Sequence, residues 1–365
     1  VVLTGGSVTA SSISANGYDI TINATGSVAV TGSIDTSAAS NSSGNGANGG
    51  AVTISAGSSL TLGSVVTDGG NSTYSNSGRY YDSGDHNWHN YNNSYNGGNA
   101  GVISLTGSSI SLSGNISAAG GTSNTGNSGL GGAVSFASPL LLTDNLSITT
   151  TGQTDGAISF GSTIDGNKSL TINTRRTTVL NANIGSSNHL ASLTMSGPVT
   201  INASAITTTG TQTYNGAITL GADVTLTASG ITTTSTISAG NYDLTMIADA
   251  FNLGGNITGS GTSVLTIQPK TNGTTIGLGT SAPGTISLTA TELAYLRTPS
   301  VIIGGSGVTG LITVNASAIN SAVTNFTLQN SGSSGNGGIT IAGALSGLTN
   351  FTLTTAGTLR INNNI

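Results

Sequence analysis

Apolar residues recur along almost the whole chain as short pairs of the form apolar-x-apolar, separated by runs of Gly, Ser, Thr and Asn. Ile158/Phe160, Leu244/Met246 and Leu265/Ile267 are examples. Side chains at positions i and i+2 of a strand point to the same side, so each pair predicts a short strand with one buried face. No apolar run approaches the roughly 20 residues that would span a bilayer as a helix.

Three stretches of the chain repeat one another. Gly49–Val65 holds three short strand patterns divided by two Gly/Ser turns, Ala100–Ile116 repeats it, and Gly131–Phe136 begins a third copy. Downstream, apolar pairs are spaced by 21 to 27 residues, as from Leu193 to Ile218. A period in the low to mid twenties, divided into three strands, is typical of one turn of a β-helix, in which stacked coils bury their apolar residues together.

The sequence therefore predicts an all-β fold, a right-handed parallel β-helix (solenoid) with three short strands per coil. Residues 1–365 would form a single domain with one long loop insertion. An antiparallel sandwich is the alternative, but its strands would run to about five or six residues with clearer hairpin signals. Thr291–Arg297 predicts one short helical turn capped by Thr291.

Composition supports many short strands and turns and narrows the classes of partner. Gly contributes 56 residues, and only 5% of residues are charged. The net charge is -5, and the seven Lys and Arg residues are scattered, which argues against a nucleic-acid partner. The chain has no cysteine and starts at Val1 without a signal peptide. We expect a fragment or processed part of a longer secreted chain.

The largest break in the pattern is the insertion at residues 71–99, which is rich in Tyr, Asn and His. It contains five of the nine tyrosines, the only tryptophan and two of the three histidines. Exposed aromatic residues on a loop are enriched at interfaces, so the candidate contact residues are Tyr74, Tyr80, Tyr81, Trp88, Tyr91 and Tyr95.

Three interpretations of this insertion remain open. It could pack on itself and cover the flank of the coils, or it could contact a neighbouring subunit or a glycan. It could also bind a metal ion through Asp85, His86 and His89, because two imidazoles and a carboxylate suit zinc or nickel. No other cofactor is expected. The Gly/Asn loops at 41–50 and 120–132 lack the repeated Asp of calcium-binding nonapeptides.

The acidic and basic residues do not form a catalytic pattern. Lyases and hydrolases with this fold need clustered Asp with Lys or Arg, or paired carboxylates. Here the acidic residues are isolated and mostly lie in turns, where Asp commonly caps its own backbone. The basic pair Arg175-Arg176 has no obvious acidic partner by spacing. We therefore expect no enzymatic activity.

Several segments resemble the repeats of filamentous-haemagglutinin-type exoproteins, which use two-partner secretion. These segments are Gly49–Ile54, Gly57–Leu62, Leu190–Leu226 and Leu288–Arg297. The resemblance implies a secreted or cell-surface bacterial filament, adhesive or structural, that acts through surface contacts and is exported by a partner transporter. The family's amino-terminal secretion domain, with its Asn-Pro-rich motifs, is not visible, because none of the five prolines follows Asn.

Other functions remain open beside this one. Val1–Thr4 and Leu359–Ile365 both look competent to form strands, which suggests a self-assembling head-to-tail filament subunit. A polysaccharide-binding or polysaccharide-degrading β-helix is a further alternative. Thr207–Thr209 and Thr232–Thr234 would fit an ice- or glycan-binding array if it extended over many coils. The expected partners are the chain's own subunits or neighbouring fibres, glycans, and host or cell surfaces.

Overall fold

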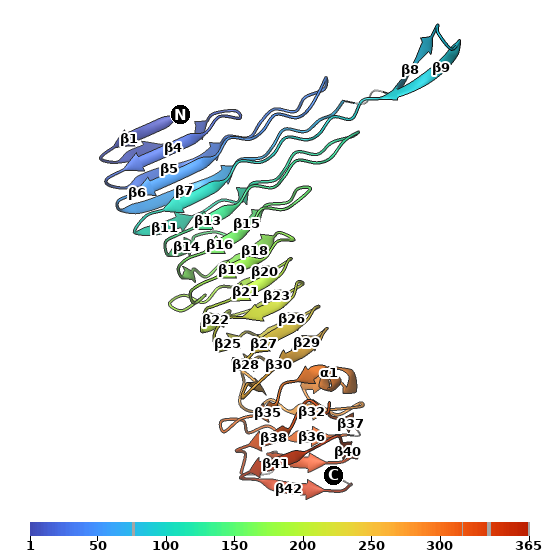
Figure 1. The fold of residues 1–365 in the computed structure, drawn as a ribbon. Coiled ribbons are helices and arrows are strands. Elements are labelled where there is room, and N and C mark those ends of the chain that lie inside the picture. The colour runs from blue at the N-terminus through green and yellow to red at the C-terminus, as the bar shows by residue number, and fades with distance from the viewer. Residues whose placement is uncertain (75–76, 316, 334–336, 364–365) are drawn as a thin grey trace. The chain divides into compact units, whose positions relative to one another are not determined.

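The computed structural model describes residues 1–74, 77–315, 317–333 and 337–363. These fall into two compact units. Unit 1 comprises residues 1–162 and 171–178, and unit 2 comprises residues 163–170 and 179–365. In each unit, strands pair in parallel with strands of the neighbouring coils (Figure 1), which confirms the parallel β-helix.

Each coil of unit 1 supplies three strand segments, as the repeat predicted. β5 and β7 are long and turn a corner, so each fills two positions of its coil. The strands of unit 1 are β1 (Val2–Gly5), β2 (Val8–Ala10), β3 (Ile13–Ser14), β4 (Ile20–Ala24), β5 (Val28–Asp35), β6 (Val52–Ala56), β7 (Ser59–Val66), β8 (Ser77–Asp82), β9 (Asn87–Asn92), β10 (Ile103–Thr106), β11 (Ser109–Leu112), β12 (Ile116–Ser117), β13 (Val134–Phe136), β14 (Leu140–Leu142), β15 (Leu146–Thr149) and β16 (Ile158–Phe160).

Like residues lie over like in the core of unit 1. Ile54 pairs in register with Leu105, Leu105 with Phe136, and Phe136 with Phe160. The two phenylalanine rings stack with centroids 5.0 Å apart and planes 2° apart. The alignment of the three sequence repeats is confirmed, because Ile103 pairs with both Val52 and Val134.

Unit 1 also carries a stack of extended out-and-back segments, here called the Gly-rich fin. It comprises residues 36–50, 67–74 with 93–101, 118–132 and 150–156. Figure 1 shows its longer segments as blue to teal loops lying alongside one another. Backbone hydrogen bonds join outgoing to returning segments, as from Gly70 N–H to the Ala47 carbonyl, Gly98 N–H to Gly70, and Gly121 N–H to Gly98.

Glycine is required inside the fin because the segments touch backbone to backbone. A Cβ built on Gly98 would lie 1.8 Å from the Ala47 carbonyl oxygen, and one on Gly121 would lie 2.0 Å from the Gly70 carbonyl oxygen. No side chain fits at that separation. The loops at 41–50 and 120–132 are therefore stacked structural layers of the fin.

Buried threonines and Asx side chains complete the hydrogen bonding of the fin. The Thr67 hydroxyl donates to the Gly101 carbonyl at 2.8 Å across the base of its segment. The Asn48 side-chain oxygen accepts the Asn99 N–H, and the Asn99 side-chain oxygen accepts the Leu130 N–H. Asp68 likewise accepts the Ala119 N–H of the next coil. These Asx side chains therefore cap backbone groups of a neighbouring coil.

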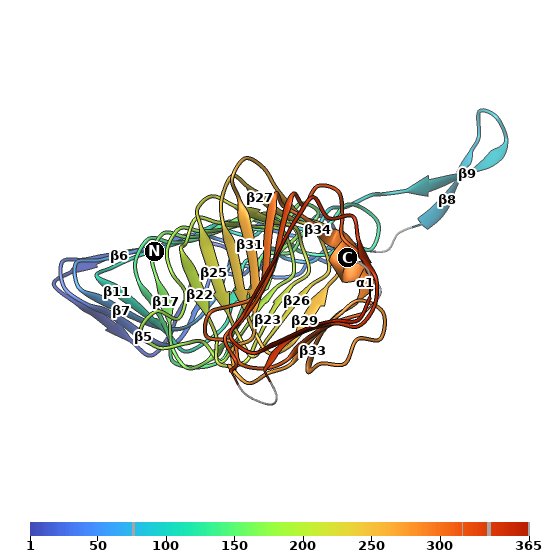
Figure 2. The same cartoon turned by 90° about the horizontal axis from the view of Figure 1, so that it is seen from below.

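Unit 2 is also built from coils of short strands (Figure 2). Two strands, β18 (Ser169–Asn173) and β19 (Thr178–Leu180), cross the sequence boundaries between the units. The other strands are β17 (Ile164–Asp165), β20 (Ser192–Met195), β21 (Val199–Ile201), β22 (Ala205–Thr207), β23 (Thr211–Tyr214), β24 (Ile218–Leu220), β25 (Val224–Thr227), β26 (Gly230–Thr233), β27 (Ile237–Gly240), β28 (Leu244–Ile247), β29 (Phe251–Leu253), β30 (Ile257–Gly259), β31 (Val264–Gln268), β32 (Ile276–Leu278), β33 (Ile286–Leu288), β34 (Leu296–Arg297), β35 (Ser300–Gly304), β36 (Ile312–Val314), β37 (Ser317–Ala318), β38 (Asn325–Asn330), β39 (Gly338–Ile341), β40 (Leu345–Ser346), β41 (Asn350–Thr355) and β42 (Thr358–Ile361).

The repeat length predicted for the middle of unit 2 is wrong. Val199 pairs with Ile218 and Ile218 with Ile237, so one coil there takes 19 residues. The predicted spacing of 25 residues, from Leu193 to Ile218, compared strands at different positions of the coil, because Leu193 in fact pairs with Gln212. Strand patterns within one coil are too alike for spacing alone to identify the neighbour.

One helix, α1 (Ala290–Tyr295), lies among the described residues. Its cap is Thr289 and not Thr291. The Thr289 hydroxyl accepts the Glu292 N–H, and the Glu292 carboxylate accepts the Thr289 N–H. Glu292 also accepts the Leu253 N–H at 2.9 Å, so the chain's only glutamate joins the helix to β29.

Candidate contact site on the hairpin

The insertion contains an antiparallel hairpin formed by β8 and β9, drawn in cyan in Figures 1 and 2. Its register pairs Tyr80 with His89, Tyr81 with Trp88, and Asp82 with Asn87. Successive residues of a strand point to opposite faces, so these pairs divide the hairpin into two faces. We call them the aromatic face, with Tyr81 and Trp88, and the acidic face, with Tyr80, Asp82 and His89.

The aromatic face is exposed to solvent. Tyr81 is 49% exposed and Trp88 is 64% exposed. Their rings meet edge to face with centroids 5.5 Å apart, an arrangement that aromatic quadrupoles favour. His86 lies on this side of the turn, with its Nδ1 atom 3.4 Å from the Tyr81 hydroxyl. Two large rings thus form a fixed apolar surface with polar groups at its margin.

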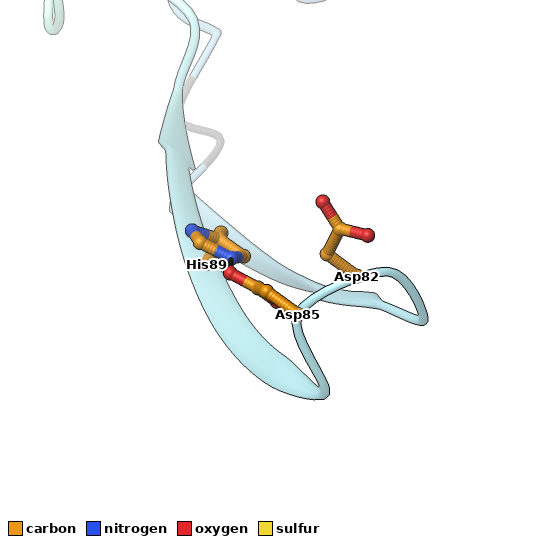
Figure 3. Close-up of side chains that lie close together, drawn as sticks. All are labelled: Asp82, Asp85 and His89. Atoms are coloured by element: carbon orange, nitrogen blue, oxygen red, sulfur yellow. Dashed lines mark hydrogen bonds and ion pairs between the residues drawn. The ribbon is translucent and has the colours of Figure 1, made fainter.

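The acidic face gathers three possible metal ligands around the turn (Figure 3). One ligand atom from each of Asp82, Asp85 and His89 lies within 4.8 Å of the others. The His89 Nε2 atom is 2.6 Å from the Asp85 Oδ2 atom. Of the predicted set, the structure brings Asp85 and His89 together, places His86 on the other face, and adds Asp82.

The six predicted contact aromatics do not share one role. Tyr80 is 50% exposed and stacks on His89 with ring centroids 5.4 Å apart. Tyr74 and Tyr95 are half-buried and pack edge to face against each other at 4.8 Å, where the hairpin leaves the fin. The side chain of Tyr91 lies outside the described part of the structure.

A polar groove, which sequence reasoning missed, lies on the outgoing face of the fin. It has a volume of about 420 Å³, and its polar lining includes Ser37, Ser40, Asp68, Asn71 and Thr122. These residues come from three coils, so the groove exists only because the fin segments stack. No spacing within one coil reveals it.

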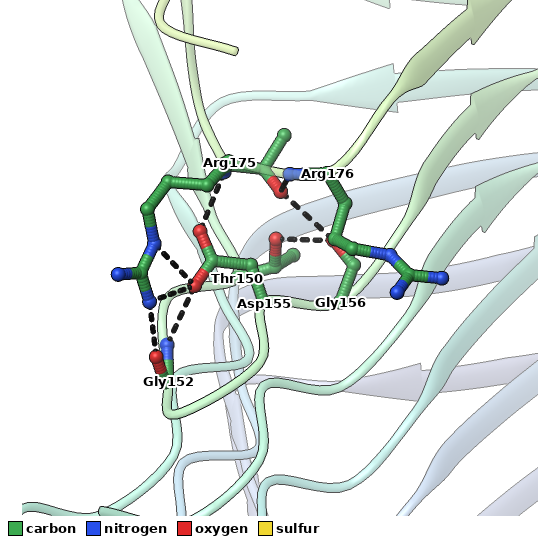
Figure 4. A network of polar contacts seen from close by, with 7 residues as sticks. Thr150, Gly152, Asp155, Gly156, Arg175 and Arg176 are labelled. Atoms are coloured by element: carbon green, nitrogen blue, oxygen red, sulfur yellow. Dashed lines mark hydrogen bonds and ion pairs between the residues drawn. The ribbon is translucent and has the colours of Figure 1, made fainter. Parts of the chain in front are cut away.

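The Arg175-Arg176 pair does have an acidic partner, contrary to the sequence interpretation. Arg175 forms two side-chain hydrogen bonds with Asp155, at 3.1 and 2.7 Å, and its backbone N–H donates to the same carboxylate at 2.5 Å (Figure 4). The Asp155 side chain has no exposed surface, whereas the Arg175 side chain is 71% exposed.

The balance of forces on Asp155 favours its charged form. Burial is the largest influence and raises the pKa of this carboxyl, but the hydrogen bonds from Arg175 and Gly152 and the Arg175 charge together lower the pKa below its ordinary value. Thr150, at the start of the same short fin segment, donates to the Gly156 carbonyl at 2.7 Å. This network closes the last and shortest segment of the fin.

Comparison of the chain with protein-family models found no match. No curated protein and no solved structure matches it either. Among the described residues, no helix is long and apolar enough to cross a membrane. The fold and the hairpin geometry are therefore the observations on which a function can be built.

Proposed function

We propose that this chain is an extracellular structural or adhesive protein of a bacterial cell surface or secreted filament, which acts through surface contacts rather than catalysis. The observation that carries the proposal is the aromatic face of the hairpin. An antiparallel hairpin interrupts parallel coils, and it holds Tyr81 and Trp88 about half exposed or more, with their rings in mutual contact.

The energetics favour a contact role for such a pair. Leaving large aromatic surface in water is unfavourable unless another surface covers it during function. Tyr and Trp are also the residues that most often dominate interface energies. Aromatic rings stack on sugar rings, and the Ser, Asn and Asp side chains of the polar groove can bond hydroxyls, so glycans and host cell surfaces are the partners proposed.

The family resemblance supports the proposed location and the fibre role. Gly49–Ile54 and its repeats pair in register, as stacked repeats of a filamentous-haemagglutinin-like exoprotein would. The extracellular location and the export by a partner transporter belong to this proposal.

The test compares adhesion of two variants that each remove exposed aromatic surface. Tyr81→Ser with Trp88→Ser should weaken binding to immobilised glycans and to cells by about 30-fold or more, the effect of losing one strong interface residue of about 2 kcal/mol. The matched control is Tyr18→Ser, since Tyr18 is 75% exposed in the same unit but away from the hairpin sequence. Adhesion that falls equally in both variants, or in neither, would refute the proposal.

A second candidate function is assembly of copies through their coil edges. β42 is the last strand of its sheet and exposes Leu359 and Ile361, at 43% and 51%. No further strand pairs with β42 among the described residues, and an edge strand with apolar side chains invites pairing with another chain. Leu359→Lys with Ile361→Lys should then abolish end-to-end association measured by sedimentation and electron microscopy. Filaments that persist in this variant would exclude assembly through β42.

A further inference from the structure

The turn of the hairpin places three chemically suitable donors on one face. Tyr80 and His89 are a register pair, and Asp82 is two residues beyond Tyr80, so Asp82 and His89 lie on the same side of the hairpin. Asp85 reaches that side from the turn, where its Oδ2 atom meets His89 Nε2 at 2.6 Å. The acidic face therefore joins two carboxylates and one imidazole (Figure 3).

The turn also fixes these side chains through their other atoms. The Oδ1 atom of Asp82 accepts the Gly84 N–H at 2.8 Å, and the Oδ1 atom of Asp85 accepts the Asn87 N–H at 2.9 Å. The second oxygen of Asp85 is directed at His89, and the His89 ring stacks against Tyr80. The donors are held by the local backbone before any ion arrives, which lowers the ordering cost of binding.

We propose that the hairpin turn binds one divalent transition-metal ion, of which zinc is the probe, through Asp82, Asp85 and His89. One imidazole with two carboxylates is a donor set that zinc takes at about 2.0–2.2 Å in tetrahedral sites. Tetrahedral ligands at such bond lengths lie about 3.4 Å apart. The three ligand atoms all lie within 4.8 Å of one another, so small side-chain shifts bring them to that spacing. The side chains of His89 and Asp85 have room for such shifts, because they are 41% and 46% exposed.

The chemistry distinguishes this site from a calcium site. Calcium takes six to eight oxygen ligands and does not favour imidazole. The fourth position around zinc is left to water or to a group from a bound partner. The inference does not rest on adhesion, since the site is complete within one hairpin.

His86 supplies a matched control within the same turn. It is the same residue type as His89, three positions away, but it lies on the aromatic face near the Tyr81 hydroxyl. Replacing it leaves all three proposed ligands in place. Any general effect of losing an imidazole from the turn would appear equally in His86→Gln and His89→Gln.

The experiment titrates zinc into the tag-free chain and into its variants by calorimetry. We expect one zinc ion per chain. His89→Gln should lose more zinc affinity than the about 10–100-fold that removal of an outer-shell partner costs. Asp82→Asn should also bind zinc clearly more weakly than the unaltered chain. His86→Gln should bind as the unaltered chain does. Nuclear magnetic resonance should show the His89 Nε2 signal moving on zinc addition while His86 signals keep their positions.

The outcomes are decisive in both directions. Binding that survives in His89→Gln, depends on His86, or is absent from the unaltered chain would overturn the inference. Unchanged circular dichroism of each variant shows that the coils remain folded, so a lost signal reports the site itself. Adhesion assayed in the same variants keeps the two ideas apart, because Tyr81 and Trp88 stay intact.

Discussion

Replacing Gly98 by alanine should destabilise the fin of unit 1. The new Cβ would lie 1.8 Å from the Ala47 carbonyl oxygen and 2.4 Å from the Ala47 carbonyl carbon, both backbone atoms. Gly98 also donates to the Gly70 carbonyl at 2.9 Å, and Gly70 donates to Ala47 at 2.8 Å. Because Gly70 is bonded to both Gly98 and Ala47, the segment of Gly98 cannot move away from the segment of Ala47 without stretching these hydrogen bonds.

The magnitude follows from these two effects. Overpacking in a tightly packed region costs about 1–3 kcal/mol. Each weakened backbone hydrogen bond adds about 0.5–1.5 kcal/mol. We expect a loss of about 3 kcal/mol in the local free energy of opening, which corresponds to roughly a hundredfold change in an equilibrium constant.

Amide hydrogen exchange measures this local quantity directly. Stacked-repeat proteins open region by region, so a global unfolding midpoint would blur the effect. Exchange at Gly70, Gly98 and Gly121 should accelerate by roughly a hundredfold in Gly98→Ala. The control is Gly6→Ala in the same unit, because a Cβ on Gly6 would meet no atom within 4 Å. Equal protection in Gly98→Ala and the unaltered chain would refute the close-contact account of the fin.

Two further predictions concern the polar groups of unit 1. Thr67→Val removes the hydroxyl that donates to the Gly101 carbonyl at 2.8 Å. We expect faster amide exchange around Gly101, equivalent to a loss of about 1–2 kcal/mol in the local free energy of opening. The control is Thr61→Val on the exposed side of β7, which should have little effect. Asp155 has a lowered pKa, so its stabilising effect is present above the ordinary value of 3.8 and is lost as the pH falls through the folded-state pKa. Amide exchange at Gly152 and Arg175, whose N–H groups donate to Asp155, should therefore be faster in Asp155→Asn than in the unaltered chain at neutral pH, with a gap that closes as acid protonates Asp155. A gap that is independent of pH would show that the charge of Asp155 does not matter.

The fold was predictable because the repeated strands carry their own core. Val52, Ile103 and Val134 occupy the same place in aligned repeats, and the structure pairs them in register. In the middle of unit 2 the prediction failed because Leu193, Val199 and Ile218 have the same local pattern. Only the observed register shows that Val199 precedes Ile218 in the stack.

The chemistry of the hairpin and the fin depended on contacts that sequence spacing could not supply. Asp155 and Arg175 are 20 residues apart and meet only because their coils stack. His86 and His89 were interchangeable in the sequence, but the antiparallel register places His89 on the acidic face, whereas the turn brings His86 beside the Tyr81 hydroxyl on the aromatic face. The aromatic character of the insertion was visible from composition, whereas the division of its tyrosines into exposed and packed residues required the structure.

The most direct test of the central claim, that the hairpin carries the chain's contacts, is adhesion after its excision. The neighbouring fin segment shows how short the turn can be. Ser72 pairs with Ser123, and the Asn96 side chain accepts the Asn127 N–H, so residues 73–95 correspond to only three residues, Asn124–Gly126, in that segment. A chain in which Asn-Thr-Gly replaces residues 73–95 should retain its β-sheet circular dichroism spectrum and lose binding to glycans and cell surfaces. Full adhesion by that folded chain would contradict the account.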